Sequence, residues 1–183
     1  MAASFALRSV STTIQVLPRL SNDLSNLELR TRMLEASLLG GMAIASTKTT
    51  LSHSISYPIT LRFGVLHGLA CAFTIVQVLQ FNAERDDGPL GNIAQSLGYG
   101  TVGSFSRHLE DLLAQTGALS WLANLVPSKD DLLALAPQAI TPGRADNNPR
   151  PATVSDIETI MAAAWDRAQQ SVGPTSAGQL VHR

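Results

Sequence analysis

LSHSISYPITLRFGVLHG (residues 51–68) contains two of the four histidines of this 183-residue chain, His53 and His67. No acidic residue lies between them, and Pro58 separates them. Apolar segments flank the stretch, which places each histidine at the end of a predicted buried helix. The stretch is therefore either a half-buried loop with incidental imidazoles or one edge of a metal site, because neutral imidazole is a common ligand of zinc and iron.

Helical signals dominate on both sides of this stretch. The capping box SNLE (25–28) predicts the start of a helix that runs toward His53 and ends before Pro58, since the residue preceding proline disfavours helical angles. A loop is expected over 58–67, followed by a second core helix over 68–81. The apolar stripe predicted for the first of these helices consists of Leu27, Leu34, Leu38, Met42 and Ala45.

The rest of the chain also favours helices, and no segment alternates long enough to require a sheet. The predicted fold class is all-α and bundle-like, with one domain over 1–170 and a flexible tail over 171–183. The basic, serine-rich segment 1–20 superficially resembles a transit peptide, but one amphipathic helix explains it without cleavage. Further helices are expected at 89–98, 104–116, 128–137 with Ser128 as N-cap, and from the capping box SDIE (155–158), with Ile157, Ile160, Met161 and Ala164 facing inward.

Composition excludes several classes of protein. Hydrophobic residues make up 45% and charged residues 15% of the chain, which indicates a packed domain. The formal net charge is −1 without a basic run, so no nucleic-acid partner is expected. The most apolar run, 68–81, is too short to span a bilayer, so no membrane partner is expected either. The single cysteine, Cys71, suits a reducing cytoplasm and is expected to be an inert core residue.

The two histidines alone are a weak metal signal. They lie fourteen positions apart, so only a reversing loop can bring their rings to the same edge of a bundle. Tyr57 follows His53 by four residues and shares its face if the helical turn persists. The structural alternative is that each histidine is a satisfied polar residue or a helix cap. His108 is expected at the surface and His182 in the tail.

The longer phrase GGMAIASTKTTLSHSISYPITLRFGVLHGLACAFTIVQVLQFN (40–82) closely resembles the metal-binding core of the iron-containing (group III) alcohol dehydrogenases. The residues that carry the resemblance are His53, Tyr57-Pro58, His67-Gly68 and Gln80-Phe81-Asn82. The likeness extends over LELRTRMLEASLLGG and TPGRADNNPRPATVSDI, and so covers nearly the whole chain to about residue 165. The branch that it looks most like includes phosphonoacetaldehyde reductases and related small-aldehyde reductases.

The resemblance implies the helical metal-binding domain of the dehydroquinate synthase-like/iron alcohol dehydrogenase fold, without the N-terminal nucleotide-binding α/β domain. It implies hydride transfer between NAD(P) and a small alcohol or aldehyde whose oxygen is polarised by Fe²⁺ or Zn²⁺. His53 and His67 would be two metal ligands. Tyr57 stands where many members have another histidine, so it is either a catalytic hydrogen-bond donor or a space-filling residue.

The loop GRADNNPR (143–150) offers a possible anion site. Arg150, together with Arg144, has the fork geometry that could bind the phosphonate or carboxylate of a substrate. The structural alternative is a hydrogen-bonded turn of Asx type that fixes the loop. No residues are assigned to cofactor binding from the sequence.

The family's other two ligands, an aspartate and a histidine one helical turn apart, would lie upstream of the matched region. No acid before His53 has a histidine three or four residues later, and no glycine-rich dinucleotide-binding turn is present. The 183-residue chain alone is therefore expected to be inactive, with a separate N-terminal half polypeptide or a homo-oligomer as partner. Exposed apolar surface around GGMAIAS and the 58–67 loop predicts self-association or poor solubility.

Two other functions remain open from the sequence. One is a non-catalytic helical remnant or interaction module whose histidines persist as packing residues. The other is a maleylacetate reductase-like domain, in which the same histidine positions serve substrate binding without metal.

Overall fold

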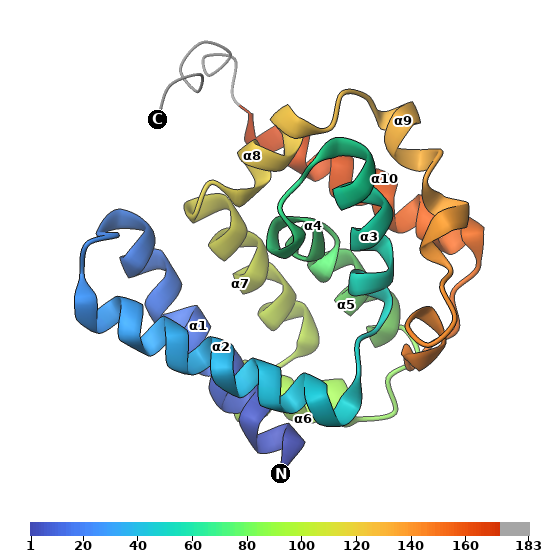
Figure 1. The fold of residues 1–183 in the computed structure, drawn as a ribbon. Helices are drawn as coiled ribbons and strands as arrows, with labels where there is room; N and C mark the ends of the chain where they lie inside the picture. The colour runs from blue at the N-terminus through green and yellow to red at the C-terminus, as the bar shows by residue number, and fades with distance from the viewer. Residues whose placement is uncertain (173–183) are drawn as a thin grey trace.

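The computed structural model describes residues 1–172, and within that range it is helical with no strand, as the all-α prediction requires (Figure 1). The first five helices are α1 (Ala2–Asn22), α2 (Leu27–Thr47), α3 (Leu51–Phe63), α4 (His67–Phe73) and α5 (Ile75–Ala83). They are followed by α6 (Pro89–Ser96), α7 (Val102–Gln115), α8 (Ala118–Leu125), α9 (Lys129–Leu133) and α10 (Val154–Ser171), with 3-10 helices η1 (Ala136–Ala139) and η2 (Ala145–Asn147). Most of the predicted tail lies outside the described residues.

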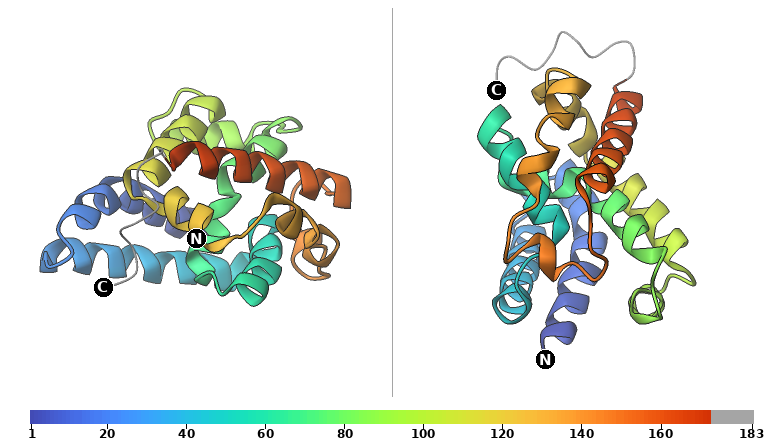
Figure 2. Two further views of the ribbon diagram at one scale, coloured as in Figure 1. Left: turned by 90° about the horizontal axis from the view of Figure 1, so that it is seen from above. Right: turned by 90° about the vertical axis from the view of Figure 1, so that its right-hand side faces the viewer.

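Helices α1 and α2 form an antiparallel hairpin along one side of the molecule, with α10 on another side (Figures 1 and 2). Their backbones approach closely where the Ser9 hydroxyl donates to the Ala36 carbonyl oxygen at 2.7 Å. A Cβ added at Gly40 would lie 3.1 Å from the Ser9 oxygen, whereas one added at Gly41 would meet nothing within 4 Å. The close approach of Ser9 therefore explains why a glycine lies at position 40 within the helix.

The buried face of α2 differs from the predicted stripe. The buried residues are Leu29, Ala36 and Ala43, while Leu27, Leu34, Leu38 and Met42 are exposed and Ala45 faces outward. Small residues face α1 because the hairpin is tight, so most of the large apolar side chains of α2 point away from α1. The apolar surface expected around GGMAIAS is present, since Met42 and Ile44 are 43% and 44% exposed.

The N-terminal cap of α2 also corrects the sequence interpretation. Asn26 is the cap, and its side-chain oxygen accepts from the Leu29 backbone amide at 3.1 Å. The Ser25 hydroxyl donates to Asp23 instead, so SNLE is not a capping box here. In α10 the capping box is formed by Thr153 and Asp156, two residues earlier than the predicted SDIE.

The predicted helix toward His53 is two helices. Helix α2 ends at Thr47, Lys48 takes a positive φ of 64°, and α3 begins at Leu51 with Pro58 inside it. A proline inside a helix costs about 3 kcal/mol, but Pro58 is buried next to fully buried residues of the core, and this packing offsets the lost hydrogen bond. The predicted loop 58–67 shrinks to residues 64–66, because Gly64 ends α3 in the left-handed conformation.

The core lies between α3, α4, α5, α8 and α10. The fully buried large side chains include Leu51, Ile55, Ile59, Leu122 and Leu132. Ile157, Ile160, Met161 and Ala164 of α10 are buried as the 3.6-residue period predicts. Ser128 caps α9 as predicted, but the sequence interpretation missed α8 entirely. Among the described residues, no helix combines the length and apolarity that a bilayer crossing requires.

Candidate metal centre

Helices α3 and α4 pack against each other and bring the two histidines of residues 51–68 together. His53 is the third residue of α3 and His67 the first residue of α4. Their ring centroids lie 5.5 Å apart, with the ring planes inclined at 60°. The short turn at residues 64–66 provides the reversal that sequence spacing alone could not.

Cys71 joins the two histidines, which the sequence interpretation missed. The nearest ligand atoms of His53, His67 and Cys71 all lie within 4.8 Å of one another. The Cys71 sulfur lies 3.6 Å from Nε2 and 4.0 Å from Nδ1 of His67, because residues i and i+4 share one face of α4. The thiol is half-buried rather than sealed in the core. The i, i+4 spacing was the available signal, but the apolar context indicated a packing residue.

Ser56 orients the His67 ring. Its hydroxyl donates to the His53 carbonyl oxygen at 2.7 Å, and its oxygen also lies 3.4 Å from Nδ1 of His67. With the hydroxyl proton donated to the His53 carbonyl, the Ser56 oxygen can accept from Nδ1–H of a neutral His67. The lone pair then lies on Nε2, the nitrogen that faces Cys71. This resembles the supporting hydrogen bond that histidine ligands usually receive from outside the coordination sphere.

The electrostatics of the cluster disfavour a charge on His53 and on Cys71. Burial lowers the pKa of His53, and the positive charges of His67 and Arg144 lower it further. Burial raises the pKa of the Cys71 thiol, and the neighbouring Ser56 side chain offsets this rise only in part. A neutral imidazole can coordinate a metal ion directly, whereas the thiol must first release its proton.

Tyr57 and Arg144 form the edge of the cluster. The Tyr57 ring lies 5.4 Å from the His67 ring, and the Arg144 guanidinium carbon lies 4.3 Å above the Tyr57 ring centroid. The loop that carries Arg144 is held against the start of α3, where the Asn147 side chain donates to the Thr49 carbonyl oxygen at 3.2 Å. Among the described residues, no carboxylate pairs with Arg144.

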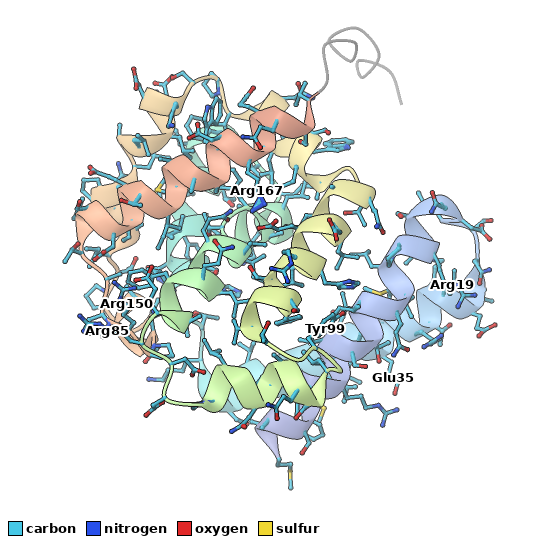
Figure 3. The ribbon with its side chains drawn as sticks, turned by 180° about the vertical axis from the view of Figure 1, so that it is seen from behind. Arg19, Glu35, Arg85, Tyr99, Arg150 and Arg167 are labelled. Carbon is cyan, nitrogen blue, oxygen red and sulfur yellow. The ribbon has the colours of Figure 1, made fainter. Side chains whose placement is uncertain are left out.

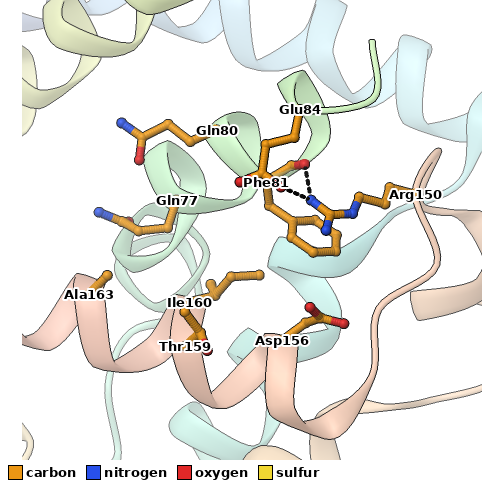
Figure 4. Close-up of a pocket in the computed structure, with 9 residues that line it drawn as sticks. All are labelled: Gln77, Gln80, Phe81, Glu84, Arg150, Asp156, Thr159, Ile160 and Ala163. Carbon is orange, nitrogen blue, oxygen red and sulfur yellow. Dashed lines mark hydrogen bonds and ion pairs between the residues drawn. The ribbon is translucent and has the colours of Figure 1, made fainter.

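Arg150 lies elsewhere and is engaged by the protein itself. Its Nη1 donates to the Phe81 carbonyl oxygen at 2.7 Å and to a Glu84 carboxylate oxygen at 2.6 Å, and its guanidinium lies 3.7 Å from the Phe81 ring centroid (Figure 4). In Figure 3 it lies on the side of the molecule away from Glu35 of α2. Asn148 adds reciprocal bonds to Asn82 at 3.1 and 2.7 Å. These contacts hold the loop against α5.

His108 is not the surface residue that the sequence suggested. Its ring packs 5.1 Å from the Tyr99 ring, and its Nε2 is buried without a hydrogen-bond partner among the described residues. Tyr99 also packs on Phe105, at 5.2 Å between ring centroids. This aromatic group stands apart from the candidate metal centre.

The residues at the centre fit a divalent transition metal. Two imidazoles and a thiol are the ligand types that zinc and related ions prefer, and they converge from two adjacent helices. No carboxylate belongs to the cluster among the described residues. The donor set can hold an ion and leave a coordination position open for a further ligand.

Comparison with known proteins identifies the family. Residues 1–165 match the Fe-containing alcohol dehydrogenase family, C-terminal, and the chain belongs to this family. The all-helical fold agrees with the resemblance seen in the sequence.

Individual members of the family are similar to this chain over most of its length. The chain is 31% identical over 156 residues to phosphonoacetaldehyde reductase of Streptomyces viridochromogenes, covering 78% of this chain and 38% of that protein. It is 28% identical over 160 residues to maleylacetate reductase 2 of Cupriavidus pinatubonensis, covering 87% and 44%. The structure of sulfoacetaldehyde reductase from Bifidobacterium kashiwanohense in complex with NAD+ superposes with a TM-score of 0.78 at 28% identity, covering 90% and 44%. The chain thus spans less than half the length of these relatives.

Proposed function

We propose that this chain supplies the metal-binding part of the active centre of an NAD(P)-linked reductase of small aldehydes. The observation that carries the proposal is the convergence of His53 and His67, with ring centroids 5.5 Å apart, in a member of the iron-containing alcohol dehydrogenase family. The relatives include proteins named as aldehyde reductases, one of them with bound NAD+. We assign His53 and His67 as ligands of Fe²⁺ or Zn²⁺.

The residues of the chain have separable roles in this proposal. A bound divalent ion would act as a Lewis acid toward the carbonyl or alkoxide oxygen of the substrate. His53 and His67 would hold that ion, and Ser56 supports the His67 ring through the 3.4 Å contact at Nδ1. Tyr57 lies against His67 and can donate a hydrogen bond from its hydroxyl to the substrate oxygen. The nicotinamide would be bound by residues outside the described ones or by a partner polypeptide.

Arg144 is the better candidate for the charged end of the substrate than Arg150. Arg144 stacks on Tyr57 at the edge of the cluster, whereas Arg150 is bonded to Phe81 and Glu84. Two relatives are named for aldehydes that carry a phosphonate or a sulfonate. A guanidinium binds either group through paired hydrogen bonds, so we infer a small anionic aldehyde as the substrate class.

A metal-free role is the second candidate. Arg144 beside the two histidines could bind a carboxylate directly, and the chain is 28% identical to a maleylacetate reductase over 160 residues. In this role a chelator would leave activity unchanged. A third outcome, a helical remnant without activity, predicts neither metal binding nor turnover.

A reductase assay tests the proposal. The chain, combined with a nucleotide-binding half supplied as a second polypeptide and loaded with Fe²⁺ or Zn²⁺, should oxidise NAD(P)H in the presence of small anionic aldehydes. His53→Ala should abolish the rate by removing a ligand, while Arg144→Gln should raise KM for an anionic aldehyde far more than for an uncharged one. Turnover that survives a chelator and His53→Ala would refute the metal-dependent mechanism. The lone free cysteine suits a cytoplasmic location, which fractionation of the host cells would test.

A further inference from the structure

Cys71 is the one chemically reactive group of the cluster that the family resemblance leaves without a role. It stands one helical turn after His67, and its sulfur faces Nε2 of that histidine at 3.6 Å. We propose that Cys71 is a third protein ligand of the metal ion, so that this chain holds the ion with two imidazoles and one thiolate. This inference rests on the proposed metal centre at His53 and His67 and extends it.

The interatomic distances suit tetrahedral coordination. With metal–nitrogen bonds of about 2.05 Å and a metal–sulfur bond of about 2.3 Å, tetrahedral geometry separates nitrogen from sulfur by about 3.6 Å. The distance from the Cys71 sulfur to Nε2 of His67 is 3.6 Å. The farthest pair in the set of three lies within 4.8 Å, which a change in side-chain rotation can close.

The surroundings favour coordination over simple packing. A cysteine that serves only packing is usually fully buried. Cys71 is half-buried and lies beside the exposed His67. In the tautomer in which the Ser56 oxygen accepts from Nδ1–H, Nε2 of His67 carries the lone pair on the Cys71 side. His53, from the neighbouring helix, completes a triangle of donors.

Coordination by sulfur has chemical consequences. The thiol gives up its proton as the metal–sulfur bond forms, so one proton is released to solvent for each ion bound. A thiolate is a softer donor than a carboxylate and favours Zn²⁺ over Fe²⁺ relative to a site without sulfur. It also reduces the net charge of the centre by one. This chain should therefore prefer zinc more strongly than its Cys71→Ser variant does.

X-ray absorption at the zinc edge tests the proposal on the 183-residue chain loaded with Zn²⁺ alone. The wild type should show a sulfur neighbour at about 2.3 Å beside nitrogen at about 2.0–2.1 Å. Cys71 is the only cysteine of the chain, so thiolate sulfur in a monomeric sample has one source. Cys71→Ser and Cys71→Ala should lose the sulfur neighbour. Zinc affinity should fall by at least about 100-fold, because residues that only support the ligands already cost up to about that much when they are replaced.

The outcomes separate this inference from the function on which it rests. A wild-type spectrum with nitrogen and oxygen neighbours only, and unchanged affinity in Cys71→Ser, overturns the role of Cys71 while the histidine site stands. If the wild type binds no stoichiometric zinc, or if His53→Ala leaves affinity unchanged, the metal centre itself is wrong and the inference falls with it. Circular dichroism of each variant verifies the fold, and the wild-type spectrum does not depend on any variant folding.

Discussion

Two helical hairpins of this protein use their contacts in opposite ways. The α1–α2 hairpin packs through small residues such as Ala36 and Ala43, with leucines such as Leu34 facing outward. The α3–α4 hairpin buries large side chains on one face and gathers two imidazoles and a thiol on the other. The first hairpin therefore exposes an apolar surface. The second packs into the core and carries the candidate metal ligands.

The difference shows that apolar content does not locate the core by itself. Helix α2 carries many leucines, yet most are exposed, because α1 approaches along the small residues. Helix α3 carries serine, histidine and tyrosine, yet Ile55 and Ile59 on its inner face are completely buried. Rigid packing of α3 is what allows His53 to be held at a fixed distance from His67.

The largest expected effect separates the two hairpins by stability. Ile55→Ala removes a side chain that is 0% exposed and should lower the free energy of unfolding by about 2–5 kcal/mol, through lost burial and the remaining cavity. Leu34→Ala is the matched control, since this side chain is 71% exposed and the change should stay within about 0.5 kcal/mol. Urea unfolding followed by circular dichroism measures both. Equal losses would show that α2 is buried in solution.

The two arginines of the 143–150 loop give the next effect. Arg150→Gln removes charge-assisted bonds to Glu84 and the Phe81 carbonyl, as well as the stacking on Phe81, and should destabilise the protein by about 1–3 kcal/mol. Arg144→Gln should change stability little, because among the described residues its side chain forms no ion pair and stacks on the half-buried Tyr57 ring. Thermal unfolding compares them. A larger loss for Arg144→Gln would make Arg144 structural and weaken its proposed role in binding.

The glycine pair of α2 probes how tightly the first hairpin packs. Gly41→Ala should stabilise the protein by about 0.5–1 kcal/mol, because alanine favours the helix and a Cβ there meets nothing within 4 Å. Gly40→Ala should gain less or lose, because its Cβ would lie 3.1 Å from the Ser9 oxygen that bonds to Ala36. The difference in unfolding midpoint between the two variants is the measurement. Adding Ser9→Ala to Gly40→Ala should restore the gain, and failure to do so would contradict the close approach.

The smallest effect on stability concerns the outward leucines. Leu34→Gln together with Leu38→Gln should leave the free energy of unfolding nearly unchanged, because both side chains are mostly exposed. Self-association should nevertheless decrease, since contiguous exposed apolar surface promotes contacts between copies. Analytical ultracentrifugation of the variant and the wild type measures this. A wild type that stays monomeric at high concentration would contradict the predicted tendency to associate.

Much of the fold could be predicted because its signals are local. The 3.6-residue period placed Ile157 and Met161 inward, and Ser128 was recognised as a cap. Pro58 misled because the rule against proline in helices is local, while the packing that overrides it comes from distant segments. The buried face of α2 could not be predicted either, since its sequence supports two faces and only the position of α1 selects one.

For the candidate site, too, the sequence indicated local features but not the contacts between distant segments. The phrase around His53 and His67 indicated the pair, but their approach depends on the turn at residues 64–66. Cys71 had a visible helical spacing from His67 and was set aside because its neighbours are apolar. Our proposal of Arg144 rather than Arg150 rests on long-range contacts, namely the stack on Tyr57 and the bonds to α5.

Equilibrium dialysis against Zn²⁺ tests the central claim, that His53 and His67 form one metal site, most directly. The wild-type chain should bind one ion per molecule. His53→Ala and His67→Ala should each abolish stoichiometric binding, because each variant lacks one of the two imidazole ligands. His182→Ala serves as the control and should bind as the wild type does. Retention of full binding by both ring variants would contradict the account.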